Sequence, residues 1–354
     1  MRVKQPADDD MLLQEDEFER LLITVDRRQE PIRVDKYLTH RIAGISRNRV
    51  QQAIEAGLVK WLDPYGQRPP QPIKANYKVK PGDQFEVWLF VQPDTEEIVP
   101  EPIPLDIVYE DAHVMVINKP AGLVVHPGNG NYAHTLVNGL AYHLQHTTQD
   151  VLPRWGLVHR IDKNTSGLLV VAKSDLALRH LAQQFFAHST ERKYLALVWG
   201  DLPQDSGTIR AHIGRHQRYR QLMDAYPDGE LGKEAITHYR VLERFYYVTL
   251  VECQLETGRT HQIRVHMQHI GHPLFNDETY GGNRIVKGTV YKAYKDFVHR
   301  CFEIMPRQAL HAQTLGFTHP ATGKRMHFEA PLPEDFRKLL EAWRNYVAQL
   351  QKPI

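Results

Sequence analysis

The stretch GLVHRIDKNTSGLLVVAK, from Gly156 to Lys173, is the most informative part of the sequence. It ends in GLLVVAK, a continuous apolar run typical of a strand that is buried on both faces. The polar residues HRIDKNTS before that run form a tight connection between two apolar segments. A carboxylate flanked by Arg160 and Lys163 should stay ionised, and an ionised carboxylate can act as a nucleophile or a base. Asp162 is therefore a candidate catalytic residue, although polar connections of this kind also occur as ordinary turns.

Strands and helices are predicted on both sides of this stretch, and they do not follow a regular βαβα order. Helical periodicity follows Ser174, covers 260–271 and closes the chain at 333–350. The pattern predicts an α+β domain over 105–350 and argues against a doubly wound nucleotide-binding sheet. Segments with the composition of strands occur at 106–111, 113–120, 193–200, 237–245, 246–257, 311–317 and 325–332.

The residues before this domain divide into three parts. Residues 1–29 are acidic, so we expect a loosely ordered extension. Residues 30–92 show two short helical patterns followed by strands, which predicts a small separate domain whose second helix exposes Arg47 and Arg49. Residues 93–104 are rich in proline and acidic side chains and are expected to be a solvated linker.

Composition and charge restrict the class of protein. With 42% hydrophobic and 24% charged residues, the chain has an ordinary soluble mixture, and no apolar run reaches the roughly 18 residues of a membrane span. The N-terminus has no apolar signal segment, and Cys253 and Cys301 cannot form a disulfide framework, so a cytoplasmic location is expected. Basic residues exceed acidic ones over 30–92 and 119–354, which suits a polyanionic partner or a merely solvated surface. No interface signal is visible, so a monomer is the default expectation.

A second polar block is LETGRTHQIRVHMQHIGHPLFND, which begins at Leu255. Histidines at 266, 269 and 272 could suggest a metal, but H-E-x-x-H is absent and no cysteine pair accompanies them, so no metal is expected. The start of the predicted helix should attract phosphate or carboxylate groups, because its partial positive charge adds to that of the side chains Arg259, His261, Arg264 and His266.

A third block, RAHIGRHQRYRQLMDAY, mixes cations with an aromatic residue. Arg215, Arg218 and Arg220 surround Tyr219, a combination that suits a nucleic-acid backbone and stacked bases. A solvated basic loop is the alternative. The sequence also argues against a kinase, a serine hydrolase and a P-loop nucleotide-binding protein, because the kinase spacing, G-x-S-x-G and the Walker A motif are all absent.

The N-terminal module resembles the RNA-binding domain of ribosomal-protein-S-four type, also called the alpha-L motif. The matching segments are RVDKYL, SRNRVQQAIEAGLV and NYKVKPGDQFEV, whereas the loop KWLDPYGQRPP is longer than the usual Val-Asn-Gly turn. The resemblance implies that Arg47, Arg49 and Lys74 contact structured RNA.

The three polar blocks and their order resemble the RluA/RluD family of RNA pseudouridine synthases. The signatures are HRIDKNTSGLLVVAK at His159, ERKYLALVWG at Glu191, and the block at Leu255. With the N-terminal module the similarity covers about residues 32–345 and is greatest for the RluD-like branch. It implies a pseudouridine synthase catalytic fold, that is, a mixed, largely antiparallel sheet with flanking helices.

The resemblance also implies roles for individual residues. Asp162 matches the catalytic aspartate, Tyr194 the tyrosine that stacks on the target uracil and assists proton removal from carbon 5, and Arg264 the partner of the aspartate. The 210–220 block matches an RNA-gripping loop. Support of the site and of base flipping is assigned to Arg160, His159, Arg259 and His261.

The implied reaction isomerises uridine to pseudouridine without a cofactor. The bond between ribose and N1 breaks, the base rotates, and the bond re-forms through carbon 5. The target base must leave its stack, which costs a few kcal/mol. The expected partner is RNA, most simply 23S large-subunit ribosomal RNA. The alternatives are the same chemistry on tRNA and a non-catalytic RNA-binding ribosome assembly factor.

Overall fold

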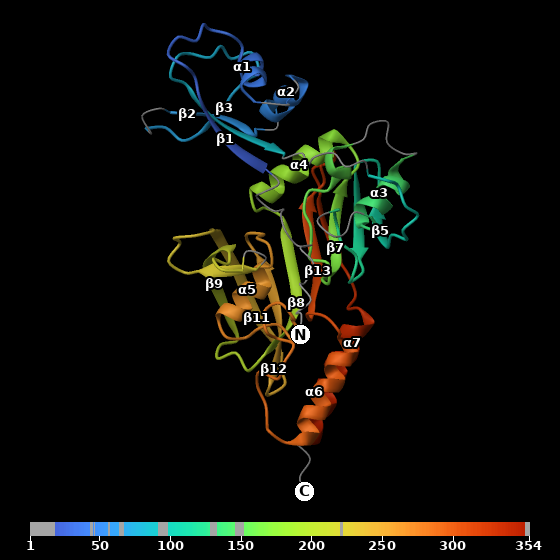
Figure 1. Cartoon of the computed structure of the whole chain (residues 1–354). Helices are drawn as coiled ribbons and strands as arrows, with labels where there is room; N and C mark the ends of the chain where they lie inside the picture. The colour runs from blue at the N-terminus through green and yellow to red at the C-terminus, as the bar shows by residue number, and fades with distance from the viewer. Residues whose placement is uncertain are drawn as a thin grey trace. The chain divides into compact units, whose positions relative to one another are not determined.

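The computed structural model describes residues 18–42, 45, 47–55, 57–63, 67–90, 98–127, 133–145, 152–219 and 222–350. These residues form two compact units, one before residue 91 and one after residue 97 (Figure 1). None of the described helices is both long and apolar enough to cross a membrane.

The N-terminal unit packs two helices on a small antiparallel sheet. The helices are short and amphipathic, and they bury Leu38, Val50 and Ile54 against Phe85 of the sheet. The strand order is β1-β4-β2-β3. The elements are β1 (Phe18–Thr24), α1 (Val34–Arg41), α2 (Arg47–Glu55), β2 (Val59–Leu62), β3 (Gln71–Pro72) and β4 (Gln84–Phe90).

The expectation of a loosely ordered extension over 1–29 is wrong for residues 18–24, which form β1 and pair with β4 along its whole length. Within this acidic segment a short stretch alternates as a strand does. Leu21 and Ile23 pack against the core of the unit, while Leu22 between them is exposed. Residues 1–17 lie outside the described residues.

The C-terminal unit is built on a ten-stranded sheet with the order β10-β9-β11-β12-β8-β13-β7-β6-β5, and β14 pairs with β13. Among the described strands the pairings are antiparallel except that of β7 with β13. The strands are β5 (Ile107–Glu110), β6 (Val114–Lys119), β7 (Ser166–Ala172), β8 (Glu191–Trp199), β9 (Ser206–Arg215), β10 (Met223–Tyr226), β11 (Lys233–Arg244), β12 (Val248–Leu255), β13 (Leu310–Thr318) and β14 (Arg325–Glu329).

Helices cover both faces of this sheet, as the alternation along the central strand β8 requires. Tyr194 and Ala196 face a core shared with α3 and α5, whereas Leu195 and Leu197 face a core shared with α6 and α7. The helices α6 and α7 also pack against each other (Figure 1). The helices are α3 (Leu136–Leu144), α4 (Asp175–Phe186), α5 (Gln262–His269), α6 (Lys292–Ile304) and α7 (Glu334–Leu350). The predicted α+β class with a mixed, largely antiparallel sheet is confirmed.

The expectation of a solvated linker over 93–104 is wrong for the described residues 98–104. Ile98 packs against the large apolar core, and the backbone N–H of Glu101 donates to the carbonyl of Asn138 in α3 at 3.0 Å. Ile98 and Ile103 are partly buried, so this segment packs on the unit although its composition is acidic. The unit therefore extends at least to residue 98 rather than starting at 105.

Candidate active site

Asp162 lies in the connection that leads into β7, within the stretch HRIDKNTS. Its backbone carbonyl accepts a hydrogen bond from the N–H of Thr165 at 3.0 Å, which closes a turn directly before the strand. Gly167 has φ +115, and a Cβ there would collide with the carbonyl of Ala312 in β13. Glycine at this position thus lets β7 approach β13. The Asp162 turn, which directly precedes β7, therefore lies near the first residues of both strands.

The carboxylate of Asp162 accepts a hydrogen bond from Nη1 of Arg264 at 3.0 Å. The same guanidinium donates from Nε and Nη2 to the two carboxylate oxygens of Asp277, at 2.8 and 3.0 Å. The side chain of Arg264 is 4% exposed, that of Asp277 is fully buried and that of Asp162 is 19% exposed. Arg264 therefore bridges a buried anchor and a carboxylate that remains open to a substrate.

Electrostatics keep Arg264 charged. Burial alone lowers the pKa of Arg264, but the charges of Asp277 and Asp162 outweigh it, and the net direction is upward. The ring of Tyr280 also lies 5.0 Å from the guanidinium carbon, where its π face is attracted to the cation. The carboxylate of Asp162 therefore faces a permanently charged hydrogen-bond donor.

The turn before α5 fixes where Arg264 projects. Gln262 is buried, and its side-chain oxygen accepts from Thr257 Oγ1 at 2.8 Å and from the N–H of Arg259 at 2.9 Å. Its Nε2 donates to the carbonyl of Ile236 in β11 at 3.0 Å. These bonds tie the helix start to the sheet, so Arg264 is held at a fixed position two residues further along the helix.

Tyr194 of β8 contributes an aromatic ring near the carboxylate. The residue is 8% exposed. Burial raises the pKa of Tyr194 to about 12, and of the two nearby charges Arg192 lowers this pKa while Asp162 raises it. The phenol is therefore neutral at physiological pH, and it can stack on a base or donate a hydrogen bond.

Comparison with known proteins gives a consistent result. Residues 113–269 match the family model described as RNA pseudouridylate synthase. An uncharacterized RNA pseudouridine synthase of Chlorobaculum parvum is 44% identical over 94% of this chain and 100% of its own length. Ribosomal large subunit pseudouridine synthase D of Zymomonas mobilis is 43% identical over 87% of this chain and 93% of its own length.

The chain belongs to the RNA pseudouridine synthase family. It is an isomerase acting on RNA, and the resemblance to the RluA/RluD family is confirmed. A solved structure, human RNA pseudouridylate synthase domain containing 4, is similar with a TM-score of 0.51 and 24% identity, and covers 67% of this chain and 92% of that protein. That likeness supports the pseudouridine synthase fold.

The residues predicted to support base flipping in this synthase fall into different surroundings. Arg160 is half-buried in the same connection as Asp162. Arg259 donates from Nε to the carbonyl of Glu234 at 2.9 Å, at the start of β11. His261 has φ +55 and is bonded through Nδ1 to the hydroxyl of Tyr280 at 2.7 Å.

His159 is buried and has a role in the scaffold. Its Nε2 accepts a hydrogen bond from the N–H of Val170 in β7 at 2.9 Å, and its ring stacks on Phe185 of α4 at 4.4 Å. Burial, with a smaller contribution from the positive charge of Arg192, lowers the pKa of His159 to about 3. A neutral histidine with this bond fixes the connection against the strand.

The predicted RNA-contacting residues also differ from one another. Lys74 is exposed, as expected. Arg47 is 44% exposed, as expected, and its Nε and Nη2 also donate to Asp35 at 3.1 and 2.9 Å. Asp35 is fully buried, and a buried carboxylate requires such partners. The side chain of Arg49 and all of Arg220 lie outside the described residues.

The block at 210–220 is a strand and a turn rather than a loop throughout. β9 continues to Arg215, and β10 pairs with it from Met223. Arg218 is exposed at the turn, with its guanidinium carbon 5.3 Å from the ring centre of Tyr219. The cation and the half-exposed ring thus lie together at the tip of a hairpin.

Sequence reasoning missed Asp277, the anchor of Arg264. It stands in the quoted segment HPLFND, but no role was assigned to it. A signal did exist, since a buried arginine that faces one catalytic carboxylate needs a further partner. Within the described part of the chain no three His, Cys, Asp or Glu side chains are grouped so that they could hold a metal ion.

Proposed function

We propose that this synthase isomerises specific uridines of 23S large-subunit ribosomal RNA to pseudouridine, with Asp162 as the essential carboxylate. The observation that carries the proposal is the bridge Asp162–Arg264–Asp277 beside Tyr194. The substrate is supported by relatives named ribosomal large subunit pseudouridine synthase D, which are 43–44% identical over 87–92% of the chain.

The residues have complementary roles in this reaction. The flipped uridine stacks on Tyr194, and Asp162, held by Arg264, acts when the bond between ribose and N1 breaks. Attack on the sugar, attack on the ring and removal of a ribose proton all require a deprotonated, fixed carboxylate. The base then rotates and bonds to ribose through carbon 5, the proton leaves that carbon, and N1 gains a proton in its place. Substrate and product are therefore isomers, and neither water nor a redox partner is consumed.

The remaining parts bind RNA. The exposed Arg218 and Tyr219 of the β9–β10 hairpin suit a phosphate and a stacked base. The N-terminal unit, with two helices, a small sheet and the exposed Lys74, fits the alpha-L RNA-binding type and would hold structured RNA. We place the reaction in the cytoplasm, carried out by a monomer.

A pseudouridine map of ribosomal and transfer RNA, from cells with and without the gene, tests the proposal. We expect sites to be lost from 23S RNA and restored by adding purified enzyme, but not by the variant Asp162→Asn. Sites lost only from tRNA would retain the chemistry and overturn the substrate. An unchanged map, with RNA binding retained, would support the ribosome assembly factor instead.

A further inference from the structure

Arg307 is a buried cation outside the site described above. It lies between α6 and β13, and its side chain is 6% exposed. Its guanidinium binds both carboxylate oxygens of Asp335, from Nε at 2.8 Å and from Nη2 at 3.0 Å. Asp335 is the second residue of α7, so a fork-shaped ion pair joins the start of the C-terminal helix to the sheet.

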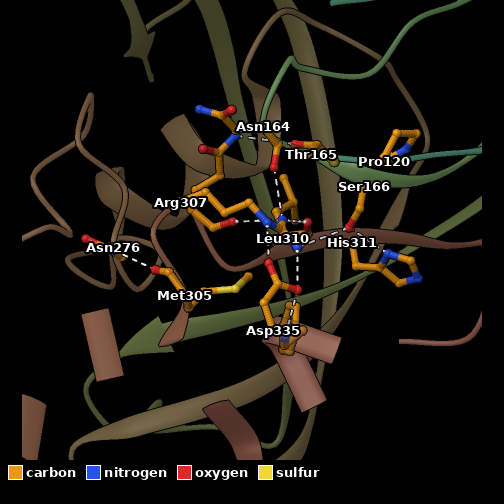
Figure 2. A network of polar contacts seen from close by, with 12 residues as sticks. Pro120, Asn164, Thr165, Ser166, Asn276, Met305, Arg307, Leu310, His311 and Asp335 are labelled. Atoms are coloured by element: carbon orange, nitrogen blue, oxygen red, sulfur yellow. Dashed lines mark hydrogen bonds and ion pairs between the residues drawn. The ribbon is translucent and has the colours of Figure 1, made fainter. Parts of the chain in front are cut away.

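The other contacts of Arg307 lead to the turn that carries Asp162 (Figure 2). Nη1 donates to the backbone carbonyl of Asn164 at 2.9 Å and to that of Leu310 at 3.2 Å, while Nη2 lies 3.4 Å from Ser166 Oγ. Figure 2 shows the guanidinium between Asp335 on one side and Asn164 and Ser166 on the other. One planar group therefore connects α7 and β13 with Asn164 and Ser166, which stand two and four positions after Asp162.

The preceding carbonyl in the same turn is also held by a buried cation. Lys119 is fully buried at the end of β6, and its Nζ donates to the carbonyl of Lys163 at 2.9 Å. Nζ also donates to the carbonyls of Pro120 and Leu123, both at 2.8 Å. Carbonyls 163 and 164 are thus both fixed by cations from outside the turn.

We propose that Arg307 is a positioning residue for Asp162, and that Asp335 holds its guanidinium for this task. The proposal rests on the catalytic role of Asp162 proposed above. A catalytic group must be held within a fraction of an ångström of its productive place, and misplacement by 1 Å can cost about 100-fold in rate. Lysine cannot reproduce the contacts, because it lacks the planar fork that binds Asp335 and Asn164 together.

The test compares Arg307→Lys and Asp335→Asn with Arg344→Gln. Arg344 lies on α7, as Asp335 does, and makes a forked ion pair with Glu243 at 2.7–3.1 Å. That pair is exposed and does not contact the turn that carries Asp162. For each purified full-length protein, three quantities are measured: the single-turnover rate of pseudouridine formation at saturating enzyme, the Kd for the RNA, and the Tm.

We expect Arg307→Lys and Asp335→Asn to lower the saturating rate about tenfold or more while the Kd changes less than about twofold. Arg344→Gln should leave the rate and the Kd unchanged. A rate equal to wild type in the folded variants, or a loss explained by the unfolded fraction or by weaker binding, would overturn the proposal. If Arg307→Lys does not fold, the rate and Kd of Asp335→Asn alone test the positioning role.

This outcome is distinguishable from failure of the proposed function. An inactive wild type on 23S RNA would refute the substrate, and an active Asp162→Asn assayed in parallel would refute the role of Asp162. An active wild type, an inactive Asp162→Asn and unaffected Arg307 and Asp335 variants would refute only the positioning role.

Discussion

Asp277 holds Arg264 with both of its carboxylate oxygens, through hydrogen bonds of 2.8 and 3.0 Å. Asp162 accepts only one hydrogen bond from the same guanidinium, at 3.0 Å. The position of Arg264 is therefore set mainly by Asp277. Asp162 is free to act on a substrate without releasing its charged partner.

Removal of this anchor should strongly reduce activity and destabilise the fold. Asp277→Asn leaves a buried guanidinium with one weakly held carboxylate, and breaking a buried pair of this kind costs about 3–5 kcal/mol. We expect a lower Tm in thermal melts and a saturating rate reduced by about 100-fold or more in the folded protein. The matched control is Asp205→Asn, which removes an exposed partner of Arg244 and should change neither quantity. Full activity of Asp277→Asn would contradict the anchoring role.

Substitutions of Tyr194 should separate stacking from hydroxyl chemistry. Tyr194→Phe keeps the ring and removes only the hydroxyl, whereas Tyr194→Leu removes both. We expect Tyr194→Phe to keep the Kd for RNA and lower the rate, and Tyr194→Leu to weaken binding as well, because stacking on a base is worth about 1–3 kcal/mol. Equal losses of affinity in the two variants would show that the ring does not stack on the target base.

The buried His159 should make the protein less stable in acid. Its pKa is about 3 in the folded protein, mainly because of burial, against about 6.5 in the unfolded chain. Between these values the unfolded chain binds more protons, so the stability from this group is complete above pH 6.5 and is lost as the pH falls toward 3. Tm measured at pH 7 and pH 5 should fall less for His159→Gln than for wild type. An identical drop in the two proteins would mean that His159 is not held neutral.

Arg47 and Lys74 should differ in what their removal affects. Arg47→Gln takes a cation from the buried Asp35 and should lower the Tm of the N-terminal unit. Lys74→Gln should leave the Tm unchanged, weaken RNA binding and reduce the slope of log K against log salt by about 0.7–0.9. Melting curves and binding titrations at several salt concentrations measure both effects. A salt slope unaffected by Lys74→Gln would remove this residue from the RNA-binding surface.

Local patterns predicted much of this fold but not its sheet order. The buried strand GLLVVAK and the helix after Ser174 are present at β7 and α4, and Ser174 Oγ accepts from the N–H of Ala177 at 3.2 Å. The placement of β13 between β7 and β8 was not predictable, because it depends on contacts between segments more than 100 residues apart. Helix α6 was also missed.

The site was predicted in part. The resemblance paired Asp162 with Arg264, which are 102 residues apart in the chain, and the structure joins them. Asp277, Arg307 and Asp335 were not predicted. The need of Arg264 for a second partner could have been inferred, but which carboxylate supplies it is visible only in the folded chain. Arg47 is exposed as expected, but its ion pair with the buried Asp35 of the neighbouring helix was not predicted.

The most direct test of the account uses Asp162→Asn, which keeps the size of the side chain and removes its charge. Purified wild-type and variant proteins are incubated with 23S RNA transcript, and pseudouridine formation and RNA affinity are measured in the same samples. We expect an unchanged Kd and no pseudouridine from the variant. Pseudouridine formed by Asp162→Asn at the wild-type rate would contradict this expectation.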